Sequence, residues 1–494
     1  MTLQEILSLK DISDKINQLK QHRKTELPDV DKLLNSWNPK RHNVMDKEKR
    51  PDEVRVVEPE EKDITTGKIV KSAKTIQVPV NRIALPLEQD IVNIHTSFTV
   101  GEQPTVDCDT DDEKEEELFK IIKQIDRKNK TKYLNKRIVR SWLSEQEVAE
   151  YWYSVKDDNF WRLILSKIKS SFGIKNNAER KLKCTVWSPF NGDKLYPFFD
   201  ETGDYKALSR EYKIRKSETE LELFFMTITD TDVYTWKNSG KDWEVVAKQT
   251  FKHNFAKNPT IYAYRNEPLC ENITQIRDRL EITLSNYADC IDYNFAPKLV
   301  AEGVVLNNNP KASRGGMVQI DNGGKLYYLS WQQSPEAAKL EIDTYIQQAY
   351  GLTNTPRISF ENLKGTGNAF SGVAFRYAFM GIQMAVKNHA EVIGEYIQRR
   401  YNFLASAVGS INTAYSDAAQ TIDIETEIVP YTINSLEENI KLAIAATGGE
   451  KIASLKTGIL LAGLIDADKV DTELEAITNE ESAKRRNDIF EPTE

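Results

Sequence analysis

The organisation of this chain follows from one polar loop, Thr353-Asn-Thr-Pro-Arg-Ile-Ser-Phe-Glu-Asn-Leu-Lys-Gly-Thr-Gly-Asn-Ala-Phe-Ser-Gly372, and from the stretch behind it. One proline and three glycines exclude a regular helix or strand within the loop. The stretch from Val373 to about Ala407 contains no proline, and its apolar side chains recur at intervals of three and four. This pattern predicts a helix on the order of 50 Å long. A shorter helix is expected just before the loop, over Pro335–Tyr350.

Polar side chains interrupt the long helix too often for a membrane-spanning segment. They are Arg376, Gln383, Lys387, Glu391, Glu395 and Arg399. From periodicity alone, the pattern is typical of a core helix that follows an ordinary surface loop. A short helix, a glycine-rich loop and a very long helix nevertheless form an unusual order of elements.

That order of elements resembles the signature of portal proteins from double-stranded DNA phages. The residues that carry the resemblance are Phe360-Glu-Asn and Asn368-Ala-Phe-Ser-Gly-Val-Ala-Phe375. They are most like the portals of tailed siphophages, which have a Ser-Gly-x-Ala step at this point. The resemblance implies an α+β portal fold with a wing, a helical stem, a small β-rich clip and a C-terminal helical crown.

The resemblance and the hydrophobic patterns together divide the chain into eight expected parts. They are an N-terminal extended arm (1–75), an α+β wing (76–268), a first stem helix (269–303), the clip (304–333), a second stem helix (334–352), the tunnel loop (353–372), a long wing helix and strand (373–434) and the crown (435–494). Alternating apolar residues between 184 and 236 predict strands in the wing. A continuous apolar stripe from Ile273 to Phe295, ended by Pro297, predicts the first stem helix.

The charge of the chain argues against a protein that wraps DNA. Among 494 residues, 40% are hydrophobic and 29% are charged, and the net charge is −8 with a pI of about 5.5. A protein that grips DNA without sequence preference needs a basic surface. An acidic or mixed wall repels phosphate, so the charge favours a conduit through which DNA slides.

No motif for catalysis, a cofactor or a metal is present in the sequence. The four cysteines form no Cys-x-x-Cys pair, the five histidines are isolated, and there is no P-loop or nucleophile elbow. Asp107, Asp109 and Asp111 have the first spacings of a calcium loop, but its glycine and its final glutamate are missing. We interpret this segment as a solvated acidic turn. The basic cluster 127–137 is interpreted as a solvated helix face that balances this turn.

The sequence therefore predicts a non-enzymatic portal protein that needs no cofactor. The resemblance implies a homo-oligomeric ring, of twelve subunits if it follows the family, at the portal vertex of the virion, assembled in the host cytoplasm. The implied partners are double-stranded DNA in the channel, the packaging terminase, the major capsid protein and the head–tail adaptor, with no membrane. Candidate channel residues in the tunnel loop are Arg357, Asn362, Lys364, Gly365, Gly367 and Asn368.

Two alternatives remain open at this point. One is another capsid or tail structural protein that uses a similar helical rod. The other is a metal-dependent nucleic-acid enzyme whose site is assembled from scattered carboxylates, for which the candidates are Asp157, Asp158, Asp230 and Asp232.

Overall fold

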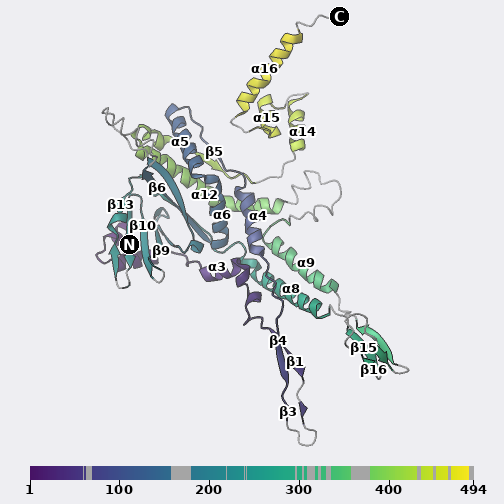
Figure 1. Ribbon diagram of the computed structural model, residues 1–494. Helices are drawn as coiled ribbons and strands as arrows, with labels where there is room; N and C mark the ends of the chain where they lie inside the picture. The colour runs from purple at the N-terminus through teal and green to yellow at the C-terminus, as the bar shows by residue number, and fades with distance from the viewer. Residues whose placement is uncertain are drawn as a thin grey trace, which may run out of the picture. The chain divides into compact units, whose positions relative to one another are not determined.

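The structure is a computed structural model of the chain. It describes residues 1–58, 61–62, 69–156, 180–217, 220–238, 240, 242–294, 298–302, 305–308, 318–320, 324–329, 335–357, 379–430, 436–448, 452–465 and 469–488. These residues belong to two compact units (Figure 1). The first unit contains residues 1–355 and 386–429, and the second contains residues 356–385 and 430–494.

The first unit begins with three short helices. They are α1 (Leu3–Ser8), α2 (Ile12–Gln21) and α3 (Val30–Trp37), followed by the 3-10 turns η1 (Pro39–Arg41) and η2 (Asn43–Met45). Each helix has a side-chain N-cap, from Thr2, Asp11 and Asp29 respectively. Residues 1–45 are therefore folded, which differs from the extended arm expected over 1–75. Each helix is too short to be stable alone, so it depends on packing that the local sequence does not reveal.

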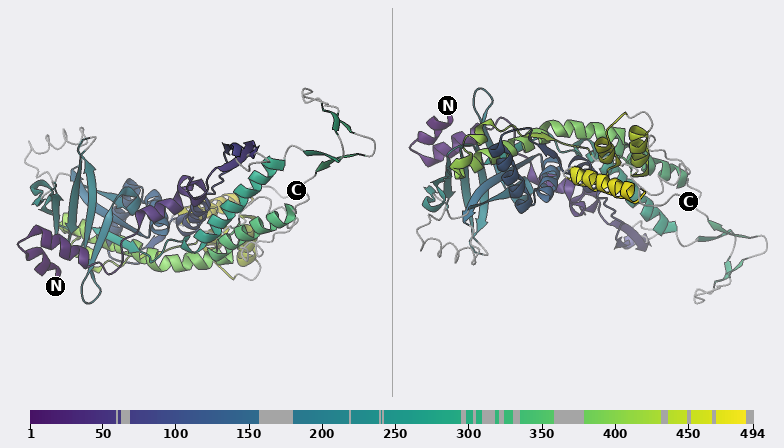
Figure 2. Two further views of the ribbon diagram at one scale, coloured as in Figure 1. Left: turned by 90° about the horizontal axis from the view of Figure 1, so that it is seen from below. Right: turned by 90° about the horizontal axis from the view of Figure 1, so that it is seen from above.

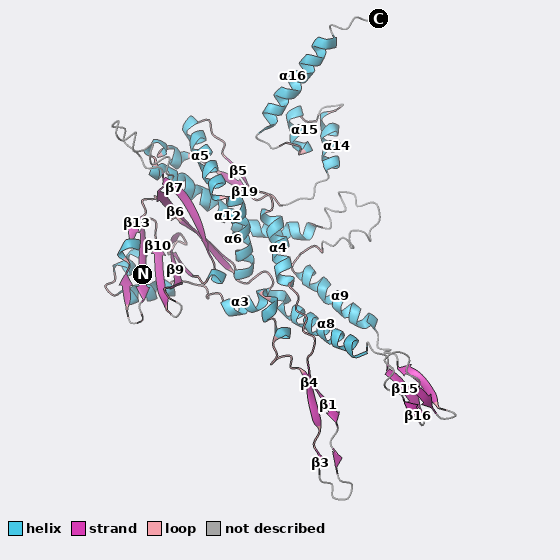
Figure 3. Cartoon of the chain, in the orientation of Figure 1, coloured by secondary structure: helices cyan, strands magenta, loops and turns pink. Residues whose placement is uncertain are grey.

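The middle of the first unit holds two antiparallel sheets. The larger sheet has the strand order β12-β11-β10-β9-β8, with β13 also paired to β11, and the smaller has the order β14-β6-β7 (Figure 3). The larger consists of β8 (Lys194–Phe199), β9 (Tyr205–Arg215), β10 (Leu221–Ile228), β11 (Asp232–Asn238), β12 (Trp243–Val245) and β13 (Phe251–Lys252). The smaller consists of β6 (Glu147–Lys156), β7 (Arg180–Trp187) and β14 (Thr260–Tyr264). The expected β-rich wing segment is confirmed.

The larger sheet is covered on both faces. On one face, Ile6, Ile16 and Leu19 of the N-terminal helices pack against Phe225 and Trp236. The opposite face meets the smaller sheet in a second core, whose buried members are Ala149, Trp187, Leu195, Leu208, Ile228, Val233 and Tyr262. Alternate residues of a strand point to opposite faces, so β8, β9, β10 and β11 supply side chains to both cores.

The outer face of the smaller sheet packs against the long helix α12 (Met380–Ile411). Trp152 of β6 lies against Phe403, with ring centroids 6.5 Å apart. Beside it, Arg400 Nε donates to Glu150 Oε1 over 2.8 Å and Nη1 donates to Asn135 Oδ1 over 2.6 Å. Arg400 and Glu150 are both fully buried. This ion pair fixes both the register and the rotation of α12 on the sheet.

Further helices complete this part of the first unit. They are α4 (Leu87–Val100), α5 (Glu113–Asn129), α6 (Thr131–Glu145) and the short α13 (Ala418–Thr421), with the strands β5 (Thr105–Asp107) and β19 (Glu425–Glu427) paired to each other. The apolar residues Leu87, Ile91 and Ile94 have helical spacing along α4. Asp112 caps α5 by accepting from the backbone N–H of Lys114 over 2.7 Å. The acidic run before α5 is thus a helix N-terminus, where negative charge is favourable.

Three more parts of the first unit are a β-hairpin, a helix pair and a group of short strands. The hairpin comprises β1 (Glu53–Glu58) paired to β4 (Lys74–Val78), and β2 (Glu61–Lys62) paired to β3 (Ile69–Lys71). The pair consists of α8 (Thr274–Asn294), preceded by the turn η5 (Glu271–Ile273), and α9 (Pro335–Leu352). The short strands are β15 (Lys298–Glu302), β16 (Val305–Asn308), β17 (Val318–Ile320) and β18 (Lys325–Leu329). Because β15 begins at Lys298, this β-rich segment starts before residue 304, inside the range expected for the first stem helix.

The second unit contains three C-terminal helices. They are α14 (Leu436–Thr447), α15 (Leu455–Ala462) and α16 (Val470–Asp488). Ser454 caps α15, and Gly463 ends it with a φ of +65°. Helices α14 and α15 pack closely, since a Cβ atom at Gly458 would overlap the side chain of Thr447. The helical C-terminal region was expected from the sequence, and the structure confirms it.

The buried ion pair on α12 yields a first prediction about stability. We expect Arg400→Met to lower the free energy of unfolding by about 3–5 kcal/mol, because it leaves Glu150 buried without its partner. Arg399→Met is the matched control, since Arg399 is half exposed and forms an i,i+4 pair with Glu395. That change should alter stability by no more than about 0.5 kcal/mol. Urea unfolding followed by circular dichroism measures both, and equal effects of the two substitutions would contradict the prediction.

Candidate functional site

The predicted channel residues lie at and beyond the C-terminal end of α9. Arg357 is described and its side chain is exposed. Asn362, Lys364, Gly365, Gly367 and Asn368 lie outside the described residues, as does the start of the long helix at 373–378. The structure instead describes the helices that lead into and out of this loop, and the contacts that hold them.

Helices α8 and α9 lie side by side (Figures 1 and 2). They have 21 and 18 residues, so each is about 30 Å long. Arg279 of α8 joins them by donating to Glu341 Oε1 of α9, with Nη2 at 2.9 Å and Nε at 3.1 Å. This side-on contact is exposed, so it orients the helices more than it stabilises them.

The first half of α8 is held by buried polar contacts. Arg277 forms an ion pair with Glu88 at the start of α4, and both side chains are almost completely buried. One turn later, Glu281 Oε1 lies 2.6 Å from His42 Nδ1 and accepts from the backbone N–H of Leu85 over 2.7 Å. Burial raises the pKa of the Glu88 carboxyl, and the charge of Arg277 opposes this shift. The histidine that looked isolated in the sequence is therefore one of the partners that fix α8.

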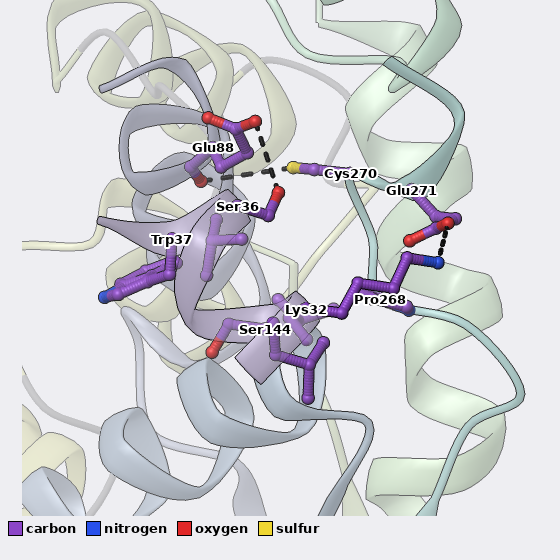
Figure 4. Close-up of a pocket in the computed structure, with 11 residues that line it drawn as sticks. Lys32, Ser36, Trp37, Glu88, Ser144, Pro268, Cys270 and Glu271 are labelled. Carbon is purple, nitrogen blue, oxygen red and sulfur yellow. Dashed lines mark hydrogen bonds and ion pairs between the residues drawn. The ribbon is translucent and has the colours of Figure 1, made fainter. Parts of the chain in front are cut away.

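A small cavity lies at this joint, between α3, α4 and the segment before α8 (Figure 4). Its volume is about 20 Å³, which is room for about one water molecule. Ser36, Glu88 and Cys270 line it, and an ion pair between Lys32 and Glu271 lies at its edge. Such a space does not accommodate an organic cofactor. We interpret it as a packing joint between the α8 helix and the helices beside it.

The end of α9 is held by a pair of buried histidines. His95 Nε2 lies 3.0 Å from both the carbonyl oxygen of Thr353 and Oγ1 of Thr355, and His95 Nδ1 lies 3.1 Å from Nε2 of His389 on α12. Burial lowers the pKa of His95 to about 4 and that of His389 to about 3, so both are neutral at pH 7.

The contacts of the pair assign its protons. A carbonyl oxygen can only accept, so His95 Nε2–H donates to Thr353, and His95 Nδ1 then accepts from Nε2–H of His389. Asn354, between the two threonines, has a left-handed φ of +53°. The chain thus turns sharply at the end of α9, and the turn is fixed by a residue of α4 and, through it, by a residue of α12. His389 is packed in the interior of the first unit, since only 7% of it is exposed.

The chemistry available to the described part of the chain is limited. Within it, no group of three or more His, Cys, Asp or Glu side chains is arranged to hold a metal ion. Of the carboxylates considered for a nuclease site, Asp157 and Asp158 lie outside this part, and Asp232 accepts a hydrogen bond from the neighbouring Thr231. The helices that the structure describes include none with the length and apolar character needed to cross a membrane.

Sequence reasoning could not have found the histidine pair or the Glu88–Arg277 pair. Their members are 294 and 189 residues apart in the chain. Glu88 and His95 both lie on α4, and nothing in the local sequence indicates that these two titratable side chains are buried.

Comparison with known proteins gives one match that covers most of the chain. A sequence model of phage portal proteins, described as SPP1 Gp6-like, matches residues 16–486. No curated protein sequence matches. Two solved structures resemble the chain at 12% sequence identity, each over 77% of this chain and 90% of theirs. They are described as "Neck of empty GTA particle computed with C6 symmetry", with a TM-score of 0.42, and "Virion of native gene transfer agent (GTA) particle", with a TM-score of 0.39.

These structural similarities are too low to carry an argument about this chain. The family match does not depend on them, and it includes both sheets, the α8–α9 pair, the loop after α9 and most of the C-terminal helices. The chain therefore belongs to the family of SPP1 Gp6-like phage portal proteins.

Proposed function

We propose that this protein forms a ring at one vertex of a phage capsid, of twelve subunits, and that double-stranded DNA passes through it during packaging and ejection. The packaging terminase would dock on the ring first, and the tail or neck adaptor afterwards. The observation that carries the proposal is the α8–α9 helix pair, which leads directly into a glycine-rich segment within a portal-family chain.

We assign the parts of a portal subunit to the elements as follows. Helices α8 and α9 form the stem, strands β15 to β18 form the clip, residues 353–372 form the tunnel loop, and α14 to α16 form the crown. The two sheets, with α4 to α6 and α12, form the wing. Residues 430–494 cluster with residues 356–385 in the second unit, whereas the two sheets and α4 to α6 lie in the first.

The charge on α9 supports a channel wall that does not retain DNA. One edge of its exposed surface carries Glu336, Lys339 and Asp343, which place both signs of charge within two helical turns. A mixed edge of this kind offers phosphate groups no continuous basic track, so passing DNA is not held. The net charge of −8 points in the same direction.

The contacts at the end of α9 support a loop that is fixed at its first residues and can adjust beyond them. His95 fixes Thr353 and Thr355, and Gly365 and Gly367 come only afterwards in the sequence. Glycine adopts many backbone conformations, so the loop can adjust to DNA while its base stays in place. In this proposal Arg357 and Lys364 contact phosphates, and Asn362 and Asn368 are neutral contacts.

The same proposal covers partners and location. The partners are further copies of this chain, double-stranded DNA, the terminase, the major capsid protein and the head–tail adaptor. The subunits would assemble in the host cytoplasm and remain at the portal vertex of the virion. We infer that the protein is not an enzyme, because the family to which it belongs is structural.

Electron microscopy of the purified full-length protein tests the ring. We expect closed particles with a central opening and a single rotational symmetry. Isolated globules would refute the ring, and an open spiral would favour a different structural role in the capsid or tail.

Substitutions in the loop test the channel role. We expect Lys364→Ala combined with deletion of residues 365–367 to reduce the length of packaged DNA and phage titre, because the loop loses a phosphate contact and its flexible hinge. Rings should still form. Lys120→Ala is the control, since Lys120 is an exposed helix residue paired to Glu116. Unchanged DNA length and titre in the loop variant would contradict this role.

Acid should weaken the contacts of His95 and His389 that hold the start of the loop. In the unfolded chain both histidines bind protons below about pH 6.5, whereas folded His95 and His389 do so only near pH 4 and 3. Their contribution to stability is therefore lost as pH falls through this window, by up to about 1.4 kcal/mol per pH unit for each histidine.

Carboxylates also bind protons in acid and also change stability. A double variant therefore separates the loss of stability caused by the two histidines from the change caused by the carboxylates. The stability difference between the wild type and His95→Gln/His389→Gln should be about 1–3 kcal/mol in favour of the wild type at pH 7, from lost buried hydrogen bonds. It should shrink or reverse at pH 4.5. Urea unfolding at both pH values measures it, and a difference that does not change with pH would refute the role of the pair.

A further inference from the structure

The junction between α5 and α6 carries a basic surface that the proposed channel does not use. Helix α5 ends at Asn129, Lys130 turns the chain with a left-handed φ of +53°, and α6 begins at Thr131 (Figure 1). Six cationic side chains occur over this short stretch, and we call them the junction cations. They are Arg127, Lys128, Lys130, Lys132, Lys136 and Arg137. All are exposed except Lys136, which is half-buried.

The junction cations of α6 lie on the side of the helix that faces water. Successive residues of an α-helix are about 100° apart, so Lys132, Lys136 and Arg137 lie within about 140° of its circumference. The opposite side of α6 is buried and includes Ile138 and Val139. The core therefore holds α6 by one side, and the cations remain available on the other.

Acidic side chains nearby are turned inward or lie too far away to neutralise this surface. Between residues 118 and 144 the sequence contains one acidic residue, Asp126, whose Oδ2 accepts from the buried hydroxyl of Tyr401. In the acidic run at the start of α5, Glu116 pairs with Lys120. Glu115 precedes Lys128 by 13 residues, about 20 Å along the helix. At physiological salt, exposed charges are largely screened beyond about 8 Å, so the acidic run leaves the junction positive.

The composition of the junction fits a polyanion better than a protein surface. Protein interfaces are depleted of lysine and enriched in aromatic and apolar side chains at their centre. Four of the six junction cations are lysines. Among residues 127–137, all of which the structure describes, only Tyr133 exposes a large hydrophobic side chain.

Among polyanions, duplex DNA matches this surface best. A single exposed ring provides no row of stacking platforms for the bases of a single strand. Duplex DNA instead presents a dense series of phosphates, which lysine and arginine bind without regard to sequence. The net charge of −8 does not oppose this contact, because screening makes the local charges decisive.

We propose that the junction cations bind the phosphate backbone of double-stranded DNA at a second site, separate from the channel. The site belongs to α5 and α6, whereas the proposed channel residues belong to α9 and the loop after it. The contact is electrostatic and independent of sequence. With about six phosphate contacts, its affinity should fall on the order of 10³-fold between about 50 and 200 mM salt.

Binding to covalently closed circular DNA tests this site without involving the channel. A closed circle has no end, so it cannot thread through a ring that has already formed. Purified full-length protein is mixed with a labelled circular duplex, and binding is measured by gel shift over a series of salt concentrations. We expect binding at about 50 mM salt that weakens steeply as salt is added. Wild-type protein that does not bind the circle would overturn the proposal.

Substitution of the junction cations tests which residues bind. We expect Lys128→Gln/Lys132→Gln/Arg137→Gln to weaken binding to the circle at least tenfold. The slope of log affinity against log salt should decrease by about 0.9 for each phosphate contact that is lost. The variant Lys128→Arg/Lys132→Arg/Arg137→Lys keeps every charge and should bind within about threefold of the wild type.

A matched control removes the same charge elsewhere on the first unit. Lys213→Gln/Arg215→Gln/Lys248→Gln replaces two lysines and one arginine, all exposed, on β9 and in the turn η4 (Ala247–Gln249) of the large-sheet region. It should leave binding to the circle within about twofold of the wild type. Equal losses in the control and the junction variant would overturn the proposal, because they would reflect net charge alone.

The outcomes also separate duplex DNA from an acidic protein, and this inference from the proposed function. If polyglutamate displaces the labelled circle as well as unlabelled duplex DNA of equal charge does, the surface fits an acidic protein segment and the proposal is overturned. Binding of the circle by a protein that forms no rings would support the junction site and refute only the ring. Rings that do not bind the circle would overturn only the junction site.

Discussion

The position of α8 depends on buried polar contacts, above all on the desolvated ion pair of Arg277 with Glu88. It joins α8 to α4, and through Ser36 it also reaches the N-terminal helix α3. A buried ion pair adds little net stability compared with apolar packing, but breaking one is costly. Its value lies in specificity, because a guanidinium and a carboxylate satisfy each other only in a narrow range of geometries. The direction of α8 relative to the sheets is therefore fixed to a degree that apolar contacts alone do not provide.

Buried ion pairs also fix other elements of the first unit. Arg400 and Glu150 fix α12 on the small sheet, and Arg23 and Glu147 fix the N-terminal segment on the same sheet. Each pair joins residues far apart in sequence, and each is almost fully buried. Buried charge pairs of this kind hold both the N-terminal segment and α12 in place on the small sheet.

The sequence was most informative where structure is local. The apolar periodicity at 273–296 predicted α8 closely, whereas most of the loop at 353–372 lies outside the described residues. The apolar spacing of the N-terminal segment is compatible with one or two short helices, but their packing on the large sheet could not be read from the sequence, because their partners Phe225 and Trp236 lie far away in the chain. The short strand β15 was also misplaced, since a strand of five residues after Pro297 has little pattern of its own. The anchoring histidines were beyond reach, because burial of His95 depends on α9 and α12, which no local pattern links to α4.

The docking of α1 and α2 on the large sheet has a consequence for biosynthesis. These helices leave the ribosome before the strands that cover Ile6 and Ile16 are made. Until β8 to β11 have emerged, the apolar faces of both helices remain open to water. The large sheet, in turn, lacks one of its two covers when α1 and α2 are absent. Loss of these two short helices would therefore expose apolar side chains in the middle of the first unit.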